Sequence, residues 1–174
     1  MSPSPLFLAT LAIATFSSCC KFQAEQTTPA SADRKFASQA AYTNLDAIAI
    51  GALASGRGED ATVRAFGRTT AEEHRAAQEQ LKRVAEPFNL SLPADIDETG
   101  MSDLNRLSAA TDAAFDTTYI AIQAARYRQA LTLFQTEIDK GKNNTVVNYA
   151  SDQWSLLVTR LRTADSLLAA AGVK

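Results

Sequence analysis

DATVRAFGRTTAEEHRAAQEQLKRVAEPF, residues 60–88, has the cleanest periodicity in the 174-residue chain. Apolar or weakly polar side chains recur there at alternating spacings of three and four, as on the buried face of an α-helix. The opposite face is charged, Asp60 is a good N-cap, and Pro87 is expected to end the helix. The pattern predicts an amphipathic helix whose buried face consists of Val63, Phe66, Thr70, His74, Ala77, Leu81, Val84 and Phe88.

Three further segments have the same period. The first covers residues 36–54 and ends in SGRG, where glycines in the left-handed conformation are expected to close the helix. The next covers residues 102–140 without Gly or Pro, which exceeds the usual helix length, so it is either bent near Thr111 and Asp112 or begins with a separate short helix. The last covers residues 145–171. Short connections between these helices predict an all-α antiparallel four-helix bundle.

Composition fits a single domain with its own hydrophobic core. The chain is 46% hydrophobic and 7% aromatic, and its net charge of −2 is spread along the sequence. Because the basic residues do not gather into a stripe, no nucleic-acid partner is expected.

The N-terminus resembles an export signal. Residues 6–16, LFLATLAIATF, form an apolar run too short for a stop-transfer helix but suited to a signal peptide. Ser17 and Ser18 then lead into Cys19, which resembles a bacterial lipobox with Cys19, or alternatively Cys20, as the lipidated residue. Ordinary cleavage and a retained anchor are the alternatives. The expected domains are a signal peptide (1–18), a flexible tether (19–32) and the bundle (33–174).

The order of several motifs is similar to that of the DUF4142 family, exported bacterial proteins of unknown function related to the ferritin-like bundles. The likeness covers roughly residues 33–170 and is most specific in LSLP at residues 90–93 and FDTTYI at residues 115–120. The other matching pieces are FASQAA (36–41), Asn44-Leu45, IGALA (50–54), VRAF (63–66) and the segment around His74. The resemblance implies a ferritin-like fold and an exported protein.

The chain departs from the family pattern at several polar positions. Glu73 stands for the acid of an Asp-His pair, Thr70 for a Met, and Tyr127 for a second histidine. Ala47 matches a position where Glu is common, and residues 154–160 match the segment that carries a third histidine. The resemblance therefore implies that a polar site built from these inward groups is largely lost.

The remaining candidate chemistry centres on His74, the one histidine. Di-iron sites of the ferritin-like type need two histidines and four carboxylates, and Ala71 stands three residues before His74, so no metal or cofactor is predicted. His74 with Glu73 and Tyr127 either binds a small polar ligand or a weak metal, or is a neutral imidazole satisfied by Tyr127 or a backbone carbonyl.

Two other groups of polar residues have a structural and a functional interpretation. Asp116 is either a ligand or, more in keeping with its place near a helix start, a hydrogen-bonding group between helices. Arg160, with Arg126 and Arg128, would bind an anion only if the three converged; otherwise they extend into solvent.

These features predict a non-enzymatic lipoprotein domain of the bacterial envelope, on the periplasmic or surface side of the outer membrane. It would be held to the membrane by its N-terminal lipid and act through contacts with an envelope protein. The alternative is a small-ligand-binding or metal-binding bundle that uses His74.

Overall fold

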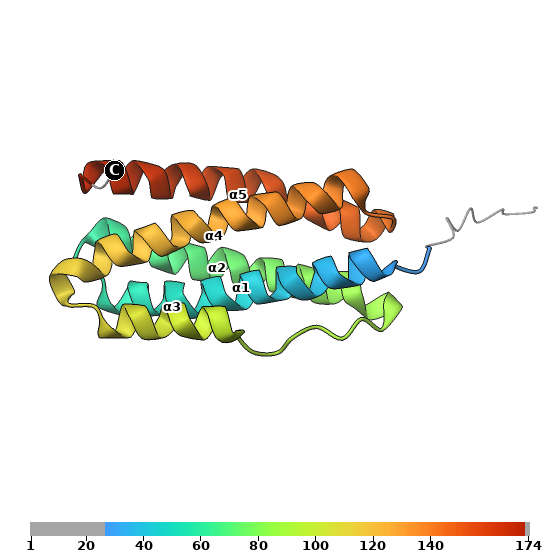
Figure 1. The fold of residues 1–174 in the computed structure, drawn as a ribbon, viewed down its shortest axis with the longest axis horizontal. Coiled ribbons are helices and arrows are strands. Elements are labelled where there is room, and N and C mark those ends of the chain that lie inside the picture. Colours follow the sequence, from blue (N-terminus) through green and yellow to red (C-terminus); the bar gives the residue numbers. More distant parts are fainter. Residues whose placement is uncertain (1–26, 173–174) are drawn as a thin grey trace, which may run out of the picture.

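The computed structural model describes residues 27–172, which are helical apart from short connections and contain no strand. Figure 1 shows the long helices lying side by side along one axis. The prediction of an all-α bundle is confirmed. In chain order, the elements are α1 (Ser31–Arg57), α2 (Ala61–Ala85), the single 3₁₀ turn η1 (Glu86–Phe88), α3 (Glu98–Ala109), α4 (Asp112–Lys140) and α5 (Asn144–Ala170).

The bundle consists of two helical hairpins and one short additional helix. α1 packs most extensively on α2, and α4 on α5, as expected for helices joined by short connections. α3 lies along both α1 and α4 (Figure 1). The predicted signal peptide and lipidated cysteine lie outside the described residues. α1 begins at Ser31, so residues 31 and 32, predicted as the end of the tether, are helical.

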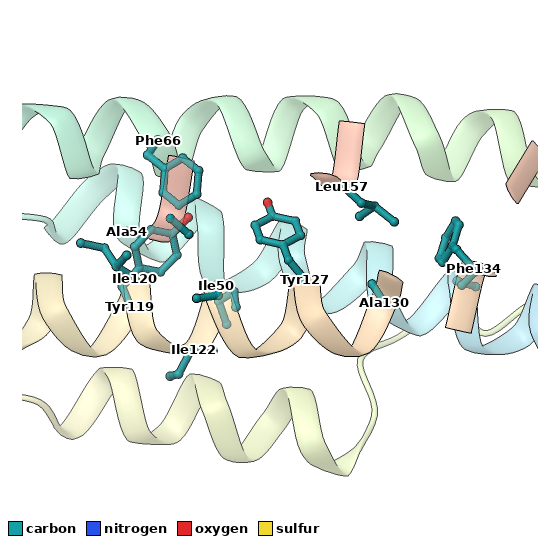
Figure 2. Close-up of a cluster of buried hydrophobic side chains, with 14 of the residues drawn as sticks. Ile50, Ala54, Phe66, Tyr119, Ile120, Ile122, Tyr127, Ala130, Phe134 and Leu157 are labelled. Carbon is teal, nitrogen blue, oxygen red and sulfur yellow. The ribbon is translucent and has the colours of Figure 1, made fainter. Parts of the chain in front are cut away.

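The stripe predicted for α2 forms one wall of the core. Asp60 is its N-cap and accepts a hydrogen bond from the backbone N–H of Thr62 at 2.6 Å. Phe66 packs edge-on against Tyr119 of α4, with ring centroids 5.9 Å apart. In Figure 2, Tyr127 extends from α4 toward α2, and Ile122 points toward α3. These side chains are buried, so one stripe on α4 faces α2 while a second meets α3.

α1 and α2 approach each other closely through glycine. A Cβ atom on Gly67 would lie 2.8 Å from both the carbonyl oxygen of Gly51 and the backbone nitrogen of Ser55. A Cβ on Gly51 would likewise lie 2.8 Å from the carbonyl oxygen of Gly67. Atoms do not pack at such separations, so this seam requires residues without side chains.

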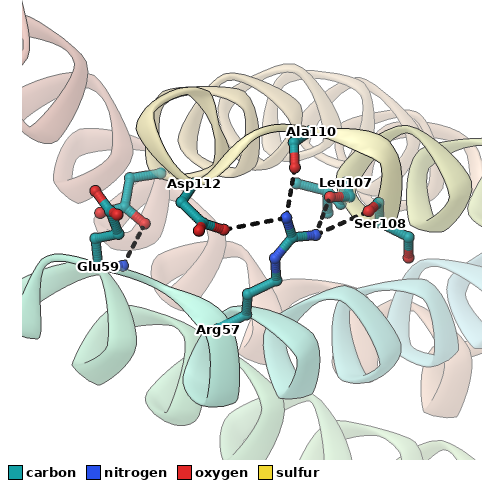
Figure 3. Close-up of polar contacts among 7 residues, drawn as sticks. Arg57, Glu59, Leu107, Ser108, Ala110 and Asp112 are labelled. Atoms are coloured by element: carbon teal, nitrogen blue, oxygen red, sulfur yellow. Dashed lines mark hydrogen bonds and ion pairs between the residues drawn. The ribbon is translucent and has the colours of Figure 1, made fainter.

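The long third helix predicted over residues 102–140 is two helices, which resolves the alternative left open by the sequence. α3 ends at Ala109, and extended backbone at Ala110 (ψ 142°) turns the chain into α4. The Arg57 guanidinium lies at this break, donating to the carbonyl oxygens of Leu107 and Ser108, both at 2.9 Å, and to that of Ala110 (Figure 3). The break therefore has its freed carbonyl groups satisfied by the last residue of α1.

The same end of the bundle holds Asp116 and corrects one glycine prediction. The Asp116 carboxylate accepts hydrogen bonds from the backbone N–H groups of Glu59 at 3.1 Å and Asp60 at 2.7 Å. Gly58 follows α1 with φ −53°, not in the expected left-handed conformation. A Cβ on Gly58 would lie 3.2 Å from the Arg64 side chain and 3.3 Å from Asp116, so crowding explains why glycine is suited to this position.

Candidate functional site

A layer of polar side chains crosses the middle of the bundle, with Asn44 of α1 at its centre. The Asn44 side-chain nitrogen donates to Gln78 Oε1 and to the Tyr149 hydroxyl, each at 3.1 Å. Its oxygen lies 2.9 Å from Nδ1 of His74. Since both amide N–H groups are used on Gln78 and Tyr149, the amide oxygen is the acceptor and His74 Nδ1 carries the proton.

This tautomer leaves a lone pair on Nε2 of His74. The side chain is 3% exposed, and Nε2 has no hydrogen-bond partner among the described residues. Burial, and then the positive charge of Arg160, lower the pKa of His74 to about 4. His74 is therefore a neutral hydrogen-bond acceptor at pH 7 whose Nε2 receives no hydrogen bond from the described residues.

The imidazole lines a cavity of about 240 Å³ between α1 and α4. Ala47 and Ile50 of α1 and Ala130 and Leu133 of α4 supply apolar walls. Gln123 also lines the cavity and is 1% exposed; its Nε2 donates to the Tyr119 hydroxyl at 3.3 Å, while its Oε1 has no partner in the described chain. The other lining residues are Gln39, Tyr42, Thr43, Asp46, Asp97, Arg126, Tyr127 and Gln129.

Charged groups gather where the cavity meets the N-terminus of α3. Arg126 pairs with Asp103, with Nη2 2.7 Å from Oδ2, and its distance to Asp46 Oδ2 is 4.0 Å. Burial and the neighbouring charge of Asp97 raise the pKa of Asp46 to about 6, against the opposing effect of Arg126. Asp46 fits because Gly100 of α3 has no side chain: a Cβ there would overlap its carboxylate.

The comparison with protein families identifies the domain. A family model described as "Domain of unknown function (DUF4142)" matches residues 20–167. The chain belongs to the DUF4142 family. No curated protein matches it. A solved structure described as "Crystal structure of DUF305 fragment from Deinococcus radiodurans" superposes with a TM-score of 0.72 at 13% identity, covering 81% of this chain and 97% of that one. At this identity, the likeness concerns the fold alone.

Two of the positions that the sequence resemblance singled out lie around one cavity. Ala47 and Tyr127 line it together with His74. The Tyr127 ring stacks on His74 with centroids 6.1 Å apart, and its hydroxyl is 3.3 Å from Thr70 Oγ1. The expected hydrogen bond between Tyr127 and His74 is therefore absent, and Asn44 is the partner of the imidazole.

The other predicted site residues have structural contacts. Glu73 and Arg160 form a two-point ion pair between α2 and α5, and Arg160 affects His74 only through its charge. Asp116 of α4 accepts hydrogen bonds from the α1–α2 turn, which is the inter-helix role considered from the sequence. It does not line the cavity. Arg126 pairs with Asp103, whereas Arg128 pairs with Asp165 and Arg160 with Glu73. The three arginines thus do not converge on an anion site.

Sequence reasoning missed Asn44, Gln123 and Asp46. Asn44 follows Ala40 by four residues and precedes Ala47 by three, and Gln123 stands four residues from both Tyr119 and Tyr127. Polar residues at helical spacing from core positions were the signal that could have revealed them. Within residues 27–172, no three His, Cys, Asp or Glu side chains are grouped so as to hold a metal ion. No helix in that range has the length and hydropathy needed to cross a membrane.

Proposed function

We propose that this DUF4142 protein is a non-enzymatic, lipid-anchored envelope domain that binds a small polar molecule in the cavity between α1 and α4. The observation that carries the proposal is the buried, unpartnered Nε2 of His74 on the wall of a cavity of about 240 Å³. An unpaired buried polar atom costs stability, and native proteins usually pair such atoms with protein, water or a ligand. A bound molecule that donates a hydrogen bond to Nε2 would remove that cost.

The exposed surface bears on the alternative hypothesis, contact with an envelope protein. Among the residues whose burial is described, Met101 is the one large hydrophobic side chain that is well exposed, at 48%. A contiguous apolar patch would mark a docking surface, and a single methionine does not form one. Contact with an envelope protein would have to depend on polar groups of the bundle.

A binding role also fits the weak basicity of His74 better than catalysis does. General bases work best when their pKa lies near the operating pH, whereas the pKa of His74 is lowered to about 4. The hydroxyl groups that line the cavity belong to Tyr42, Thr43 and Tyr127, and Tyr127 Oη is adjacent to Thr70 Oγ1. A tyrosine hydroxyl beside a threonine hydroxyl is not an activated nucleophile, because neither group is a base.

The path of the chain into the bundle fits a membrane tether. Asp33 accepts hydrogen bonds from the backbone N–H groups of Ala30 at 2.6 Å and Lys142 at 2.8 Å, and Asn143 donates to the carbonyl oxygen of Thr27. The segment before α1 is thereby attached to the α4–α5 turn. Ala47 lies about 20 Å from that end at the 1.5 Å rise per residue of a helix. A bundle anchored through residues 19–26 would keep its cavity clear of the lipid surface.

The anchor is tested by substitution of the two cysteines. Cys19→Ala is expected to move the protein from the membrane fraction to the soluble fraction and to abolish incorporation of a labelled fatty acid. Cys20→Ala is the matched control and should leave both unchanged. Loss of labelling in Cys20→Ala alone would transfer the modification to Cys20, and labelling of neither residue would contradict the anchor.

Binding is tested with a library of small fragments screened by ligand-observed NMR on the full chain in detergent. We expect fragments that bind wild-type protein and fail to bind Ala130→Leu, because the larger side chain fills the cavity. Gly56→Ala is the control: it adds a methyl group to α1 where nothing lies within 4 Å and does not alter the cavity wall. An absence of bound fragments, or equal binding to Ala130→Leu, would refute the proposal.

A further inference from the structure

Two residues that line the cavity carry a buried hydrogen-bond acceptor to which no group of residues 27–172 donates. The two most deeply buried polar residues on its wall are His74 and Gln123, and each leaves an acceptor free: Nε2 of His74 and Oε1 of Gln123. Their own N–H groups are used on Asn44 Oδ1 and on the Tyr119 hydroxyl. Asp46 also lines the cavity, but its unpartnered Oδ1 faces Gly100 of α3, so its contribution to the site is its negative charge. A molecule that satisfies these atoms must bring N–H or O–H groups.

Nε2 of His74 remains a hydrogen-bond acceptor at neutral pH. Burial and Arg160 lower the pKa of His74 to about 4, so the imidazole does not gain the second proton that would turn Nε2 into a donor. A carboxylate, phosphate or ketone oxygen entering the cavity would meet the Nε2 lone pair with its own. Such acceptor-only groups are therefore disfavoured.

The charged residues around the cavity also favour a ligand that carries hydrogen-bond donors, in this case a cation. Asp46 and Asp97 line the cavity, and Asp103 stands behind Arg126 with its oxygen 2.7 Å from Nη2. Arg126 is the one cation among these four groups and is already paired with Asp103. The balance of charge around the opening is negative, which favours entry of a cation.

Size and wall chemistry limit the remainder of the ligand. A volume of about 240 Å³ lies below the range of ~300 to 1,000 Å³ of drug-sized pockets. At ~30 Å³ for each water-sized group, it holds roughly eight non-hydrogen atoms. Ile50, Ala47, Ala130 and Leu133 offer apolar contacts, and the rings of Tyr42 and Tyr127 also line the space. A short hydrocarbon or one aromatic ring fits these walls.

Resting on the binding function proposed above, we infer that the ligand is a small primary amine: an ammonium group carried on a compact apolar body. An ammonium group has three N–H donors and can serve His74 Nε2 and Gln123 Oε1 together, whereas one hydroxyl has a single donor. Its positive charge also matches the acidic mouth. The amine is bound unchanged, since no group beside it is arranged to react.

The inference is tested with three aromatic probes that match this size: benzylammonium, benzyl alcohol and benzoate. Affinities are measured by titration calorimetry on the full chain in detergent at pH 7.5. We expect the amine to bind about tenfold or more tightly than the alcohol, in line with the ~1.4 kcal/mol of one additional hydrogen bond, and the carboxylate to bind weakest.

Substitutions test which side chains cause the preference for the amine over the alcohol. His74→Leu and Gln123→Met each remove one acceptor and should reduce the amine-to-alcohol affinity ratio several-fold, and Asp46→Asn should reduce it by lowering the negative charge. Gly56→Ala, which touches neither the cavity wall nor the Asn44 network, should retain the full ratio. Gln123→Met and Asp46→Asn provide the test if His74→Leu does not fold.

Failure of this inference differs from failure of the proposed function. If fragments bind in a way that Ala130→Leu abolishes, but the alcohol or the carboxylate equals or exceeds the amine, the amine class is wrong and the binding site stands. If the amine-to-alcohol affinity ratio is the same in all variants, the amine does not contact His74, Gln123 or Asp46. If no fragment or probe binds wild-type protein, both proposals fall.

Discussion

The two sides of α1 differ sharply in how closely the next helix approaches. On the α2 side, Gly51 and Gly67 let the two backbones touch, and a single methyl group would overlap them. On the α4 side, Ala47 and Ala130 stand beside a cavity of about 240 Å³. Small residues therefore bring helices together on one side and leave space on the other. The two sides also differ in their neighbouring helices: α3 contacts both α1 and α4, whereas α1 and α2 contact each other most extensively.

The largest expected effect is on the close seam. Gly67→Ala should lower the free energy of unfolding by about 3 kcal/mol, because the new methyl group would meet backbone atoms that cannot move independently. Chemical denaturation measures the change. Gly56→Ala in α1 is the control: nothing lies within 4 Å of the place its Cβ would take, so it should gain about 0.5–1 kcal/mol. Equal effects of the two substitutions would remove the distinction between the sides.

The next effect concerns the attachment of α3 to α1. Arg57→Met should cost about 2 kcal/mol, since it removes charged hydrogen bonds to the carbonyl groups at the end of α3 and the contact with the Phe115 ring, 4.8 Å away. Arg128→Met is the control, because its pair with Asp165 is well exposed and should contribute less than about 0.5 kcal/mol. A negligible loss in Arg57→Met would mean that α3 is held by its apolar contacts.

The buried imidazole predicts a specific pH dependence. The pKa of His74 is lowered from 6.5 to about 4 in the folded state, so the unfolded chain binds the proton first and the stability from neutral His74 is lost as pH falls below 6.5. Between pH 8 and pH 5, wild-type protein should lose about 2 kcal/mol relative to His74→Leu.

Two carboxyl groups act in the opposite direction and must be separated from this effect. Burial, followed by the charge of a neighbouring aspartate, raises the pKa of Asp46 to about 6 and that of Glu137 to about 7, so both favour the folded state as pH falls. They are present in both proteins and cancel in the difference between wild type and His74→Leu. Denaturation curves of the two proteins that remain parallel from pH 8 to pH 5 would contradict a neutral buried His74.

The smallest expected change in the free energy of unfolding is for a substitution beside the cavity, on the α4 side of α1. Ala130→Leu extends into the cavity and should alter the free energy of unfolding by less than about 1 kcal/mol. Ala124→Leu, on the same helix but fully buried away from the cavity, should cost about 2 kcal/mol through overpacking. Thermal denaturation of both variants compares them, and similar losses would indicate that the space beside Ala130 is not available to a side chain.

The sequence predicted those features that depend on one helix at a time. The α2 stripe, its Asp60 cap and the inward position of His74 follow from spacing within a single segment. The break at Ala110 was left open because the Arg57 group that satisfies its carbonyls is more than fifty residues away. The unpaired state of His74 and Gln123 was not predictable either, since it depends on how two helices are rotated toward each other.

The attachment of residues 27–30 to the α4–α5 turn determines how the fold would respond to a pull on its N-terminus. Asp33 and Asn143 join the beginning of α1 to the connection of the other hairpin. Tension applied at residue 27 would reach both hairpins at once and load these hydrogen bonds together, so α1 would not peel away one turn at a time. Mechanical resistance is thereby concentrated at the end of the bundle where residue 27 enters.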